Sequence, residues 1–400
     1  MGEYMGKIFY FKFADSLNYS TYLSAREEED FVGRAFVAGF MKSIPWDGTT
    51  NDPMTAPELI DGLPDAIAIR CIARVPYVLL HNMELVSRSW RTAIRSAEFL
   101  KVRNETNSTN DLLCVSAFDP ENLWQLYDPE SDRWLTLPAL PSKIRHLAHF
   151  GTVSAAGKLY ILGGGSDAVD PLTGDQDGSF ATDEVWAYDP MLRQWSPRAP
   201  MLVPRAMFAC NVVNGKIVVA GGFTNCRKSV THAEVYYPDK DAWESIAELP
   251  RTHDSACMGI VLHGKLLVLH KGLSAVQILD GVEGGWHVAD YGWPQGQMLV
   301  VKDEIFLMSC GSVMKLEGET WEAVAPAAEF RRRIGFAVAG VGEDIYVIGG
   351  VIGPDRWNWD IKPLSDVNAL PIGSDRPAWR RVASMSRCRG TILGVAVIRI

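Results

Sequence analysis

Apolar and polar residues alternate in short runs from about residue 112 onward, with Gly, Asp and Pro between the runs. The segment 204–250 shows one complete copy of this pattern, with Asn214-Gly215 as a hairpin turn between its first two runs. The strands predicted for this copy are residues 207–213, 216–220 and 233–237 and a fourth around Trp243. Each copy therefore predicts four antiparallel strands.

Aromatic and glycine signals recur with this pattern. A tyrosine-containing turn precedes a tryptophan in the clearest copies, and weaker copies also end in tryptophan; the positions are Trp134, Trp195, Trp243, Trp286, Trp321 and Trp379. Three apolar strands end in a glycine pair, at 163–164, 221–222 and 349–350. Such a repeat is typical of β-propeller blades, in which glycines let backbones approach and aromatic rings fill the space between blades.

The two ends of this region complete one blade between them. Residues 112–136 supply only the second, third and fourth strands, and residues 391–398 supply a lone first strand. Pairing the two segments removes the free edges of the ring. Five complete blades and this composite one predict a six-bladed β-propeller over residues 105–400.

Residues 58–104 change to a helical pattern. Leu63-Pro64 opens a helix predicted over residues 66–75, which Pro76 ends. Apolar residues occupy nearly all of its sides, although a surface helix needs an apolar face only about 100° wide. The excess predicts burial against neighbouring helices and also against another protein.

A second apolar stripe follows and steps by three or four residues, which predicts a further helix; its members are Leu79, Met83, Val86, Trp90 and Ile94. About 45 residues bury too little surface to be comfortably stable alone, which again indicates a partner. Residues 1–57 show no sustained period, and we expect a variable, partly disordered extension there.

Three segments of this helical region resemble the F-box motif: Leu63-Pro64-Asp65, residues 70–76 (RCIARVP) and residues 86–91 (VSRSWR). One departure is Ala66, where an acidic residue is common. The four-stranded units resemble kelch repeats, and from about residue 58 to 400 the chain resembles the plant-type F-box/kelch-repeat proteins. An alternative reading of the helical region is a hairpin that merely packs on the propeller.

The resemblance implies a substrate-recognition subunit of an SCF (Skp–cullin–F-box) E3 ubiquitin ligase. Its F-box would bind a Skp-family adaptor, and through it the cullin–RING ligase, while the propeller holds a target protein. The residues implied at the adaptor interface are Leu63, Pro64, Ile67, Ile72, Leu85, Val86 and Trp90. Such a subunit acts by proximity and contributes no catalytic residue of its own.

Composition limits the other classes of function. The chain carries 48 acidic and 39 basic residues, a mild net negative charge that argues against a nucleic-acid surface as its main role. No apolar run approaches the roughly 20 residues of a membrane span. The seven scattered cysteines form no Cys-x-x-Cys pair, which indicates reduced thiols in the cytoplasm and/or nucleus.

A search for catalytic, cofactor or metal chemistry gives no candidate. His146 and His149 lack a third ligand at useful spacing, and the Asp-rich segment 167–183 lacks the ligand order of an EF-hand. We therefore predict no enzyme activity, cofactor or metal. Two rival functions are kept open: a non-ligase kelch scaffold and a metal-dependent kelch enzyme.

Arginines recur just before the first strand of several blades, namely Arg145, Arg205, Arg251, Arg331, Arg332, Arg333, Arg387 and Arg389. Because these strand starts ring one mouth of the propeller, the guanidinium groups could hold carboxylates or phosphates of a target. Alternatively, each arginine pairs with an acid of a neighbouring blade and only ties the fold together. Trp357 and Trp359, in an insert predicted on the same face, suit a binding hot spot. Alternatively, they fold back on the blade.

Overall fold

The computed structural model describes residues 58–119, 121–144, 146–166, 181–309, 311–353, 361–374 and 376–400. The predicted extension 1–57 lies outside these residues. The chain divides into two compact units between Phe99 and Leu100. This division falls inside the helix α6, and the boundary predicted at residues 104/105 lies at the other end of the same helix.

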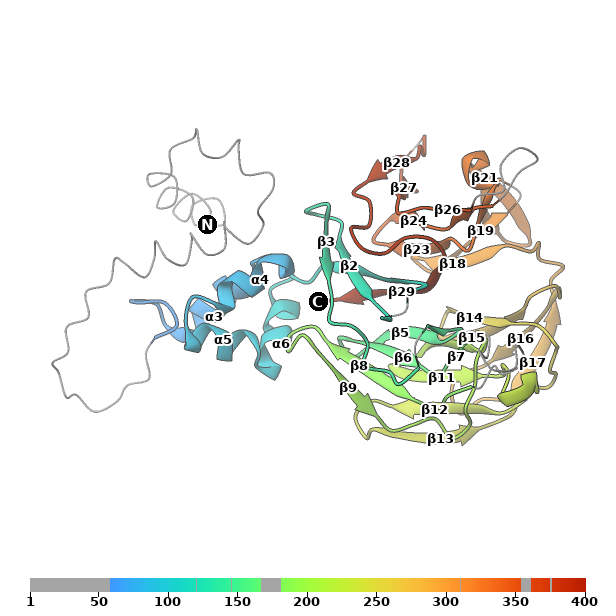
Figure 1. The fold of residues 1–400 in the computed structure, drawn as a ribbon, viewed down its shortest axis with the longest axis horizontal. Helices are drawn as coiled ribbons and strands as arrows, with labels where there is room; N and C mark the ends of the chain where they lie inside the picture. Colours follow the sequence, from blue (N-terminus) through green and yellow to red (C-terminus); the bar gives the residue numbers. More distant parts are fainter. Residues whose placement is uncertain are drawn as a thin grey trace. The chain divides into compact units, whose positions relative to one another are not determined.

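The first unit is helical (Figure 1). Its helices are α3 (Asp65–Ala73), α4 (Tyr77–Glu84), α5 (Arg88–Ile94) and the start of α6 (Ala97–Glu105). The prediction of one helix along the second apolar stripe was wrong at Val86, because the chain leaves the helix there and starts again at Arg88. The Ser87 hydroxyl accepts the Trp90 backbone N–H at 3.1 Å, and this cap begins α5.

Six four-stranded antiparallel sheets form most of the second unit, as far as the structure describes it. The composite blade has the order β29-β1-β2-β3 and contains β29 (Ile392–Arg399), β1 (Asp111–Ala117), β2 (Trp124–Asp128) and β3 (Arg133–Thr136). Blade 1 contains β5 (Gly151–Ala155), β6 (Lys158–Leu162), β8 (Val185–Asp189) and β9 (Gln194–Arg198). Blade 2 contains β10 (Ala209–Val213), β11 (Lys216–Ala220), β12 (Ala233–Tyr237) and β13 (Ala242–Ile246).

The remaining blades follow in chain order. Blade 3 contains β14 (Cys257–Leu262), β15 (Lys265–His270), β16 (Ala275–Leu279) and β17 (Trp286–Asp290). Blade 4 contains β18 (Gln297–Val301), β19 (Glu304–Ser309), β20 (Ser312–Glu317) and β21 (Thr320–Pro326). Blade 5 contains β23 (Ala337–Val341), β24 (Asp344–Ile348), β27 (Val367–Pro371) and β28 (Arg380–Val382).

Smaller elements lie in the loops before the first strand and between the second and third strands of some blades. One is the pair β4 (Leu147–Ala148) and β7 (Gly165–Ser166), and another is the three-stranded sheet of β22 (Arg333–Ile334), β25 (Val351–Ile352) and β26 (Lys362–Pro363). Two short 3-10 turns are η2 (Asn225–Arg227) and η3 (Ala328–Phe330).

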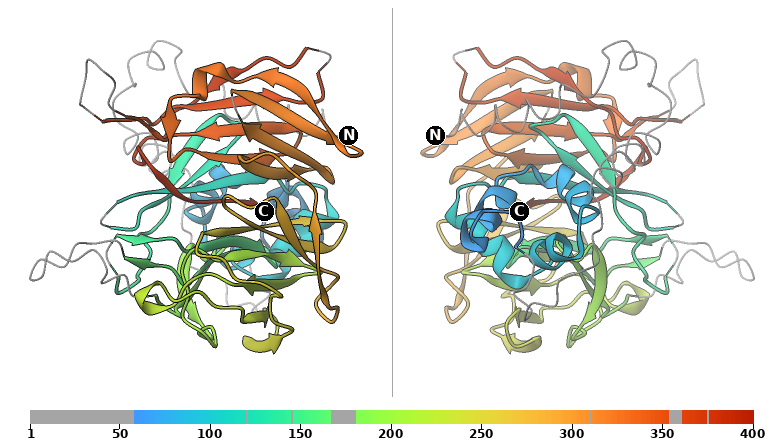
Figure 2. Two further views of the ribbon diagram at one scale, coloured as in Figure 1. Left: turned by 90° about the vertical axis from the view of Figure 1, so that its right-hand side faces the viewer. Right: turned by 90° about the vertical axis from the view of Figure 1, so that its left-hand side faces the viewer.

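The sheets form a closed ring. Followed by colour, they run in a circle, and the red β29 returns to the teal β1 and β2 (Figure 1). The orange and red sheets lie on the opposite side of the propeller from the green ones (Figure 2). β29 pairs with β1 in an antiparallel register that includes Leu113 with Val397 and Val115 with Val395. The predicted six-bladed propeller, closed by strands from both ends, is confirmed.

The glycine pairs stand where backbones come too close for a side chain. Gly222 has a φ of +85°, and a Cβ there would lie 2.6 Å from the Ala206 carbonyl oxygen. Gly350 has a φ of +92°, and its Cβ would lie 3.0 Å from the Ile334 carbonyl oxygen. Any other residue would be strained in conformation and would also push apart the second strand and the loop that enters the first.

The repeated tryptophan joins five of the six blades to the preceding blade. Its indole N–H donates to a carbonyl at the end of the fourth strand of the preceding blade or just past it, at 2.7 or 2.8 Å: Trp134 to Ala383, Trp195 to Pro138, Trp243 to Ala199, Trp286 to Ala247 and Trp379 to Pro326. Trp321 of blade 4 differs, because its buried indole nitrogen has no partner among the described residues.

Aspartates complete this junction in two blades. Asp241 accepts the Tyr236 hydroxyl at 2.6 Å and the Ala199 backbone N–H at 2.9 Å. Both polar groups of Ala199 are thus held by the next blade, since its carbonyl accepts from Trp243. Asp132, Tyr127 and Trp134 hold Ala383 in the same way. Pro138 and Pro326 have no N–H, and the junctions there use the indole bond.

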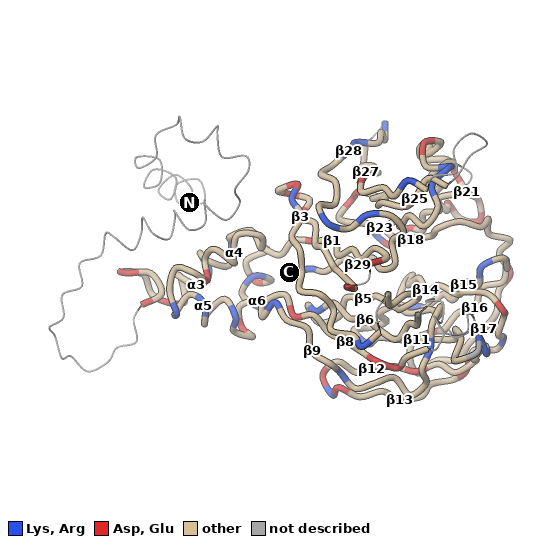
Figure 3. Tube along the Cα trace, in the orientation of Figure 1, with Lys and Arg blue, Asp and Glu red and all other residues tan. Residues whose placement is uncertain are grey.

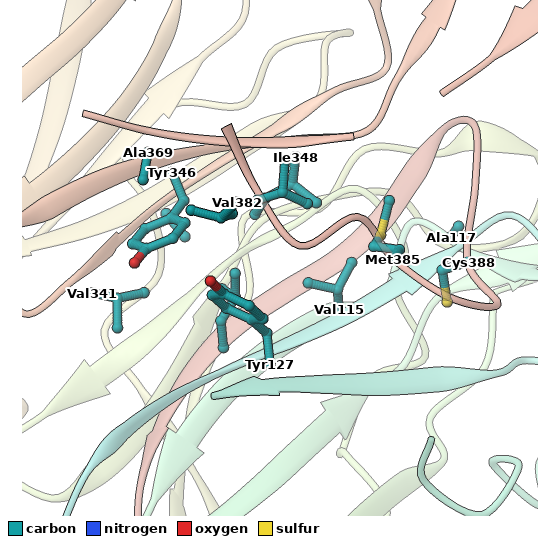
Figure 4. Close-up of a cluster of buried hydrophobic side chains, with 13 residues drawn as sticks. Val115, Ala117, Tyr127, Val341, Tyr346, Ile348, Ala369, Val382, Met385 and Cys388 are labelled. Atoms are coloured by element: carbon teal, nitrogen blue, oxygen red, sulfur yellow. The ribbon is translucent and has the colours of Figure 1, made fainter. Parts of the chain in front are cut away.

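Apolar side chains fill the space between consecutive blades, as the sequence predicted. Figure 4 shows the cluster between blade 5 and the composite blade. Tyr127 and Tyr346 approach edge to face there, with 6.0 Å between ring centroids. Met385 and Cys388, which precede β29, belong to the same cluster, so the loop that leads into the closing strand is anchored in the core.

We expect Trp243→Phe to lower the free energy of unfolding of the propeller by about 1–3 kcal/mol, because the Ala199 carbonyl then loses its buried donor. The matched control is Trp321→Phe, which deletes an indole N–H that has no partner in the described part of the chain. Thermal or urea unfolding of both variants tests this difference. Equal losses in the two variants would show that the indole hydrogen bond contributes nothing measurable.

Candidate functional site

Large apolar side chains are exposed on the helical unit. Ile67 on α3, Leu79 on α4, and Leu85 and Val86 in the loop before α5 are between 36% and 49% exposed. Pro64, which caps α3, is also exposed, while Leu63 is half-buried. Exposed apolar residues gathered within so small a unit indicate a surface that another protein covers.

Ile72 does not belong to this surface. It is 1% exposed and packs inside the unit with other buried residues of α3, so its assignment to the adaptor interface was wrong. A helix that is apolar on nearly every side offers no sequence signal for which side faces the core. Ile72 stabilises the fold that presents Ile67.

Trp90 is half-buried and ties two segments of the unit together. Its indole N–H donates to the Leu59 carbonyl, and the Leu59 N–H donates to the Asp65 carboxylate at 2.8 Å. Near the other end of α5, Arg95 forms a 2.8 Å ion pair with the buried Glu84 of α4. Trp90 therefore positions the segment before α3, and part of the Trp90 ring remains exposed.

Arg205 is buried and does not reach a target, so its assignment to the substrate face was wrong. Its guanidinium donates to Glu234 at 2.7 Å, to the Gly221 carbonyl at 2.9 Å and to the His232 carbonyl at 2.8 Å. Burial lowers the pKa of Arg205, and the charge of Glu234 opposes that shift. The pair holds the loop entering β10 against the end of β11.

A similar pair recurs in blade 5. Arg333 donates to Asp366 at 2.5 Å and to the Gly349 carbonyl at 3.3 Å. In both blades the acid lies in the arginine's own blade, so the alternative that named a neighbouring blade's acid was wrong on that point. Its wider claim, that these arginines tie the fold together, holds for Arg205 and Arg333.

Glutamine replaces the acid in two other blades. Glu234, Gln277 and Gln125 occupy equivalent positions, each opposite a valine of the second strand. Gln277 accepts the Arg251 N–H at 2.9 Å, and Gln125 accepts the Arg387 N–H at 2.9 Å. A neutral amide holds the loop backbone and leaves no buried carboxylate to draw in a guanidinium.

Several predicted arginines accordingly remain at the surface. Arg251, Arg331, Arg332, Arg387 and Arg389 are exposed. Lys and Arg positions are interspersed with Asp and Glu positions along the blades (Figure 3). Target binding by these arginines stays a prediction. Three further members of the predicted face, Arg145, Trp357 and Trp359, lie outside the described residues.

One pocket of about 720 Å³ opens between blade 5 and the composite blade. Arg387 and Arg389 line it together with Phe118, Val351 and Pro363. The pocket thus combines two exposed guanidinium-bearing residues with apolar walls, an arrangement suited to an anionic group that has an apolar neighbour.

Other chemistry is sparse in the described residues. They contain no cluster of three His, Cys, Asp or Glu side chains placed to hold a metal, and no helix among them is long and apolar enough to cross a membrane. Most of the Asp-rich segment 167–183 lies outside them. The described cysteines Cys71, Cys114, Cys210, Cys257 and Cys388 are free thiols. Burial raises the pKa of Cys114 and Cys210 to about 12.

Known proteins share both units. A model of the F-box domain matches residues 60–102, and a model of the Kelch motif matches residues 146–202 and 204–250. The F-box/kelch-repeat protein SKIP30 of Arabidopsis thaliana is 64% identical over 86% of this chain and 97% of its own length. This chain belongs to the F-box/kelch-repeat proteins. The F-box/kelch-repeat protein At1g16250 of the same plant is 30% identical over 84% of this chain and 96% of its own.

A solved structure agrees with the fold of the kelch region. The structure of YjhT is 14% identical in sequence, with a TM-score of 0.50 over 67% of this chain and 96% of its own. The kelch matches in sequence cover blades 1 and 2. Blades 3 and 4 lack the glycine pair, yet their hydrogen-bonded strand order is the same as in the other kelch blades.

Sequence reasoning missed Phe118 and Gln125, because neither belongs to a motif. Phe118 follows β1 and is 50% exposed, and Gln125 is a buried glutamine in β2. One signal was available, since alignment of the third strands places Gln125 and Gln277 where blade 2 has Glu234. A change from acid to amide at one blade position marks the loops whose arginines are not drawn into the core.

We expect Arg205→Met to lower the free energy of unfolding by about 3–5 kcal/mol, because it leaves Glu234 charged, buried and without its partner. The double variant Arg205→Met/Glu234→Leu is expected to regain most of that loss, since it removes both charges. Arg251→Met, at an exposed arginine, is the control and should change stability little. The thermal midpoints of the three variants test this expectation. A double variant no more stable than Arg205→Met would show that the unpaired charge of Glu234 is not the cause of the loss.

Proposed function

We propose that this F-box/kelch-repeat protein is the substrate-recognition subunit of an SCF-type E3 ubiquitin ligase. Its F-box binds a Skp-family adaptor, and through it the cullin–RING ligase, while the kelch propeller binds the protein to be ubiquitinated. The observation that carries the proposal is the group of exposed apolar side chains on the helical unit, Ile67, Leu79, Leu85 and Val86, in a domain that matches the F-box model.

The proposed mechanism is proximity. Adaptor and propeller hold the target near the ubiquitin-loaded enzyme, which raises the effective concentration of target lysines. The subunit itself makes and breaks no bond. The proposed location is the cytoplasm and/or nucleus, and the free thiols of the described cysteines support a reducing compartment.

The adaptor surface is tested with a triple variant, Ile67→Ala/Leu85→Ala/Val86→Ala. We expect at least about a tenfold rise in the Kd for a purified Skp-family adaptor, because three exposed apolar side chains leave the interface. Thermal stability should change little, since all three are at the surface. Calorimetric titration of the full-length chain with the adaptor measures the Kd, and a thermal scan of the same variants measures their stability.

Leu192→Ala is the matched control, because Leu192 is an exposed leucine of similar accessibility in blade 1 of the propeller. It should leave adaptor binding unchanged. Unchanged binding by the triple variant would remove the proposed interface. Failure of the folded wild-type chain to bind any Skp-family adaptor would overturn the ligase role and favour a non-ligase scaffold.

A further inference from the structure

The pocket between blade 5 and the composite blade lies on the mouth that carries the loops entering the first strands. One wall is the segment before β29, from Met385 to Thr391, and another is Phe118 at the end of β1. Val351 and Pro363, which pair across β25 and β26, form a third wall. All of these walls belong to the propeller.

The arginine-bearing wall is held rigidly. Gln125 accepts the backbone N–H groups of Arg387 and Cys388 at 2.9 and 2.7 Å, and its amide donates to the Ser386 hydroxyl at 2.6 Å. At the far end, the Gly390 N–H donates to the Leu364 carbonyl at 2.8 Å. The backbone under the two arginines is therefore fixed before any ligand arrives, which reduces the entropy lost on binding.

The two arginine side chains are exposed on either side of a buried residue. Cys388 is 4% exposed and packs in the core cluster, while Arg387 and Arg389 are exposed and line the pocket. Both side chains border the same pocket from positions two residues apart in the chain. In an extended peptide, side chains two residues apart stand on one face about 7 Å from one another.

Apolar surface adjoins the arginines. Phe118 is 50% exposed, and its ring lies 5.0 Å from that of His146, centroid to centroid. Ile334, whose strand pairs with Val351, is 65% exposed. Asp119 also lines the pocket and accepts the Glu121 N–H at 2.8 Å. The lining still has a net positive charge, because it contains two arginines and this one acid.

We propose that this pocket binds an extended acidic segment of the target, with two carboxylates two residues apart and an apolar side chain two residues further on. Arg387 and Arg389 hold the carboxylates in paired hydrogen bonds, and Phe118 with Pro363 receives the apolar side chain. The assignment rests on the proposed function, in which the propeller binds the target. It selects one junction of the ring as the recognition point.

The probe is a fluorescein-labelled, end-capped peptide, Gly-Glu-Ser-Glu-Ser-Leu-Gly, titrated with the full-length protein. The same peptide with both Glu replaced by Gln, and one with Leu replaced by Ser, are the matched probes. We expect the acidic peptide to bind at least about tenfold more tightly than the Gln peptide, because charge-assisted pairs are lost in the latter.

Arg387→Gln/Arg389→Gln should remove that preference, and Arg251→Gln, an exposed arginine outside the pocket, should keep it. Phe118→Ser should remove the preference for Leu over Ser and leave the preference for Glu over Gln. Should the Gln double variant melt earlier, the Lys double variant replaces it; it keeps the charges without the planar forks and should weaken binding severalfold.

Equal binding of the acidic and Gln peptides by the wild-type protein would overturn the inference. So would an acidic preference that survives undiminished in Arg387→Gln/Arg389→Gln. Adaptor binding is titrated with the same samples and should not change in any pocket variant. A pocket that shows no preference in a protein that binds the adaptor refutes this inference alone, whereas loss of wild-type adaptor binding refutes the proposed function.

Discussion

The indole hydrogen bond found at five of the six blade junctions is the constraint on which the propeller depends. Each sheet alone is a four-stranded antiparallel unit with two free edges, and its twist does not fix where the next sheet lies. The tryptophan of one blade fixes that position by binding the backbone just past the fourth strand of the blade before it, as Trp243 does at Ala199. At two junctions, those of Ala199 and Ala383, an aspartate of the next blade also accepts the backbone N–H of this residue.

Charge within the blades separates residues that hold the fold from residues available to a partner. A buried carboxylate such as Glu234 draws an arginine inward, and the guanidinium then fixes a loop. A glutamine at the same place, such as Gln125, fixes the loop through backbone groups and leaves the neighbouring arginines at the surface. One exchange of acid for amide thus separates a loop whose arginine is buried from a loop whose arginines are exposed, and the blades are no longer equivalent at the mouth of the propeller.

The sequence was sufficient for elements that repeat, because a period of strands, glycine pairs and tryptophans is visible without coordinates. The composite blade followed from counting strands at both ends. The errors concerned which residues are buried and which residues contact each other, because spacing along the sequence does not reveal either. Ile72 was misplaced because α3 is apolar on nearly every side, and Arg205 because its partner Glu234 lies on the third strand of the blade. The break at Val86 required weighing Ser87 as a cap against an unbroken apolar stripe.

Closure by β29 also orders events on the ribosome. The helical unit leaves the exit tunnel before any blade, and β29 leaves after every other strand of the ring. Until then β1 has a bare edge facing the future position of β29, and unpaired edges invite association with other nascent chains. The unit that matches the F-box can therefore fold during translation, while the mouth proposed to bind the target, whose wall leads directly into β29, forms at the end.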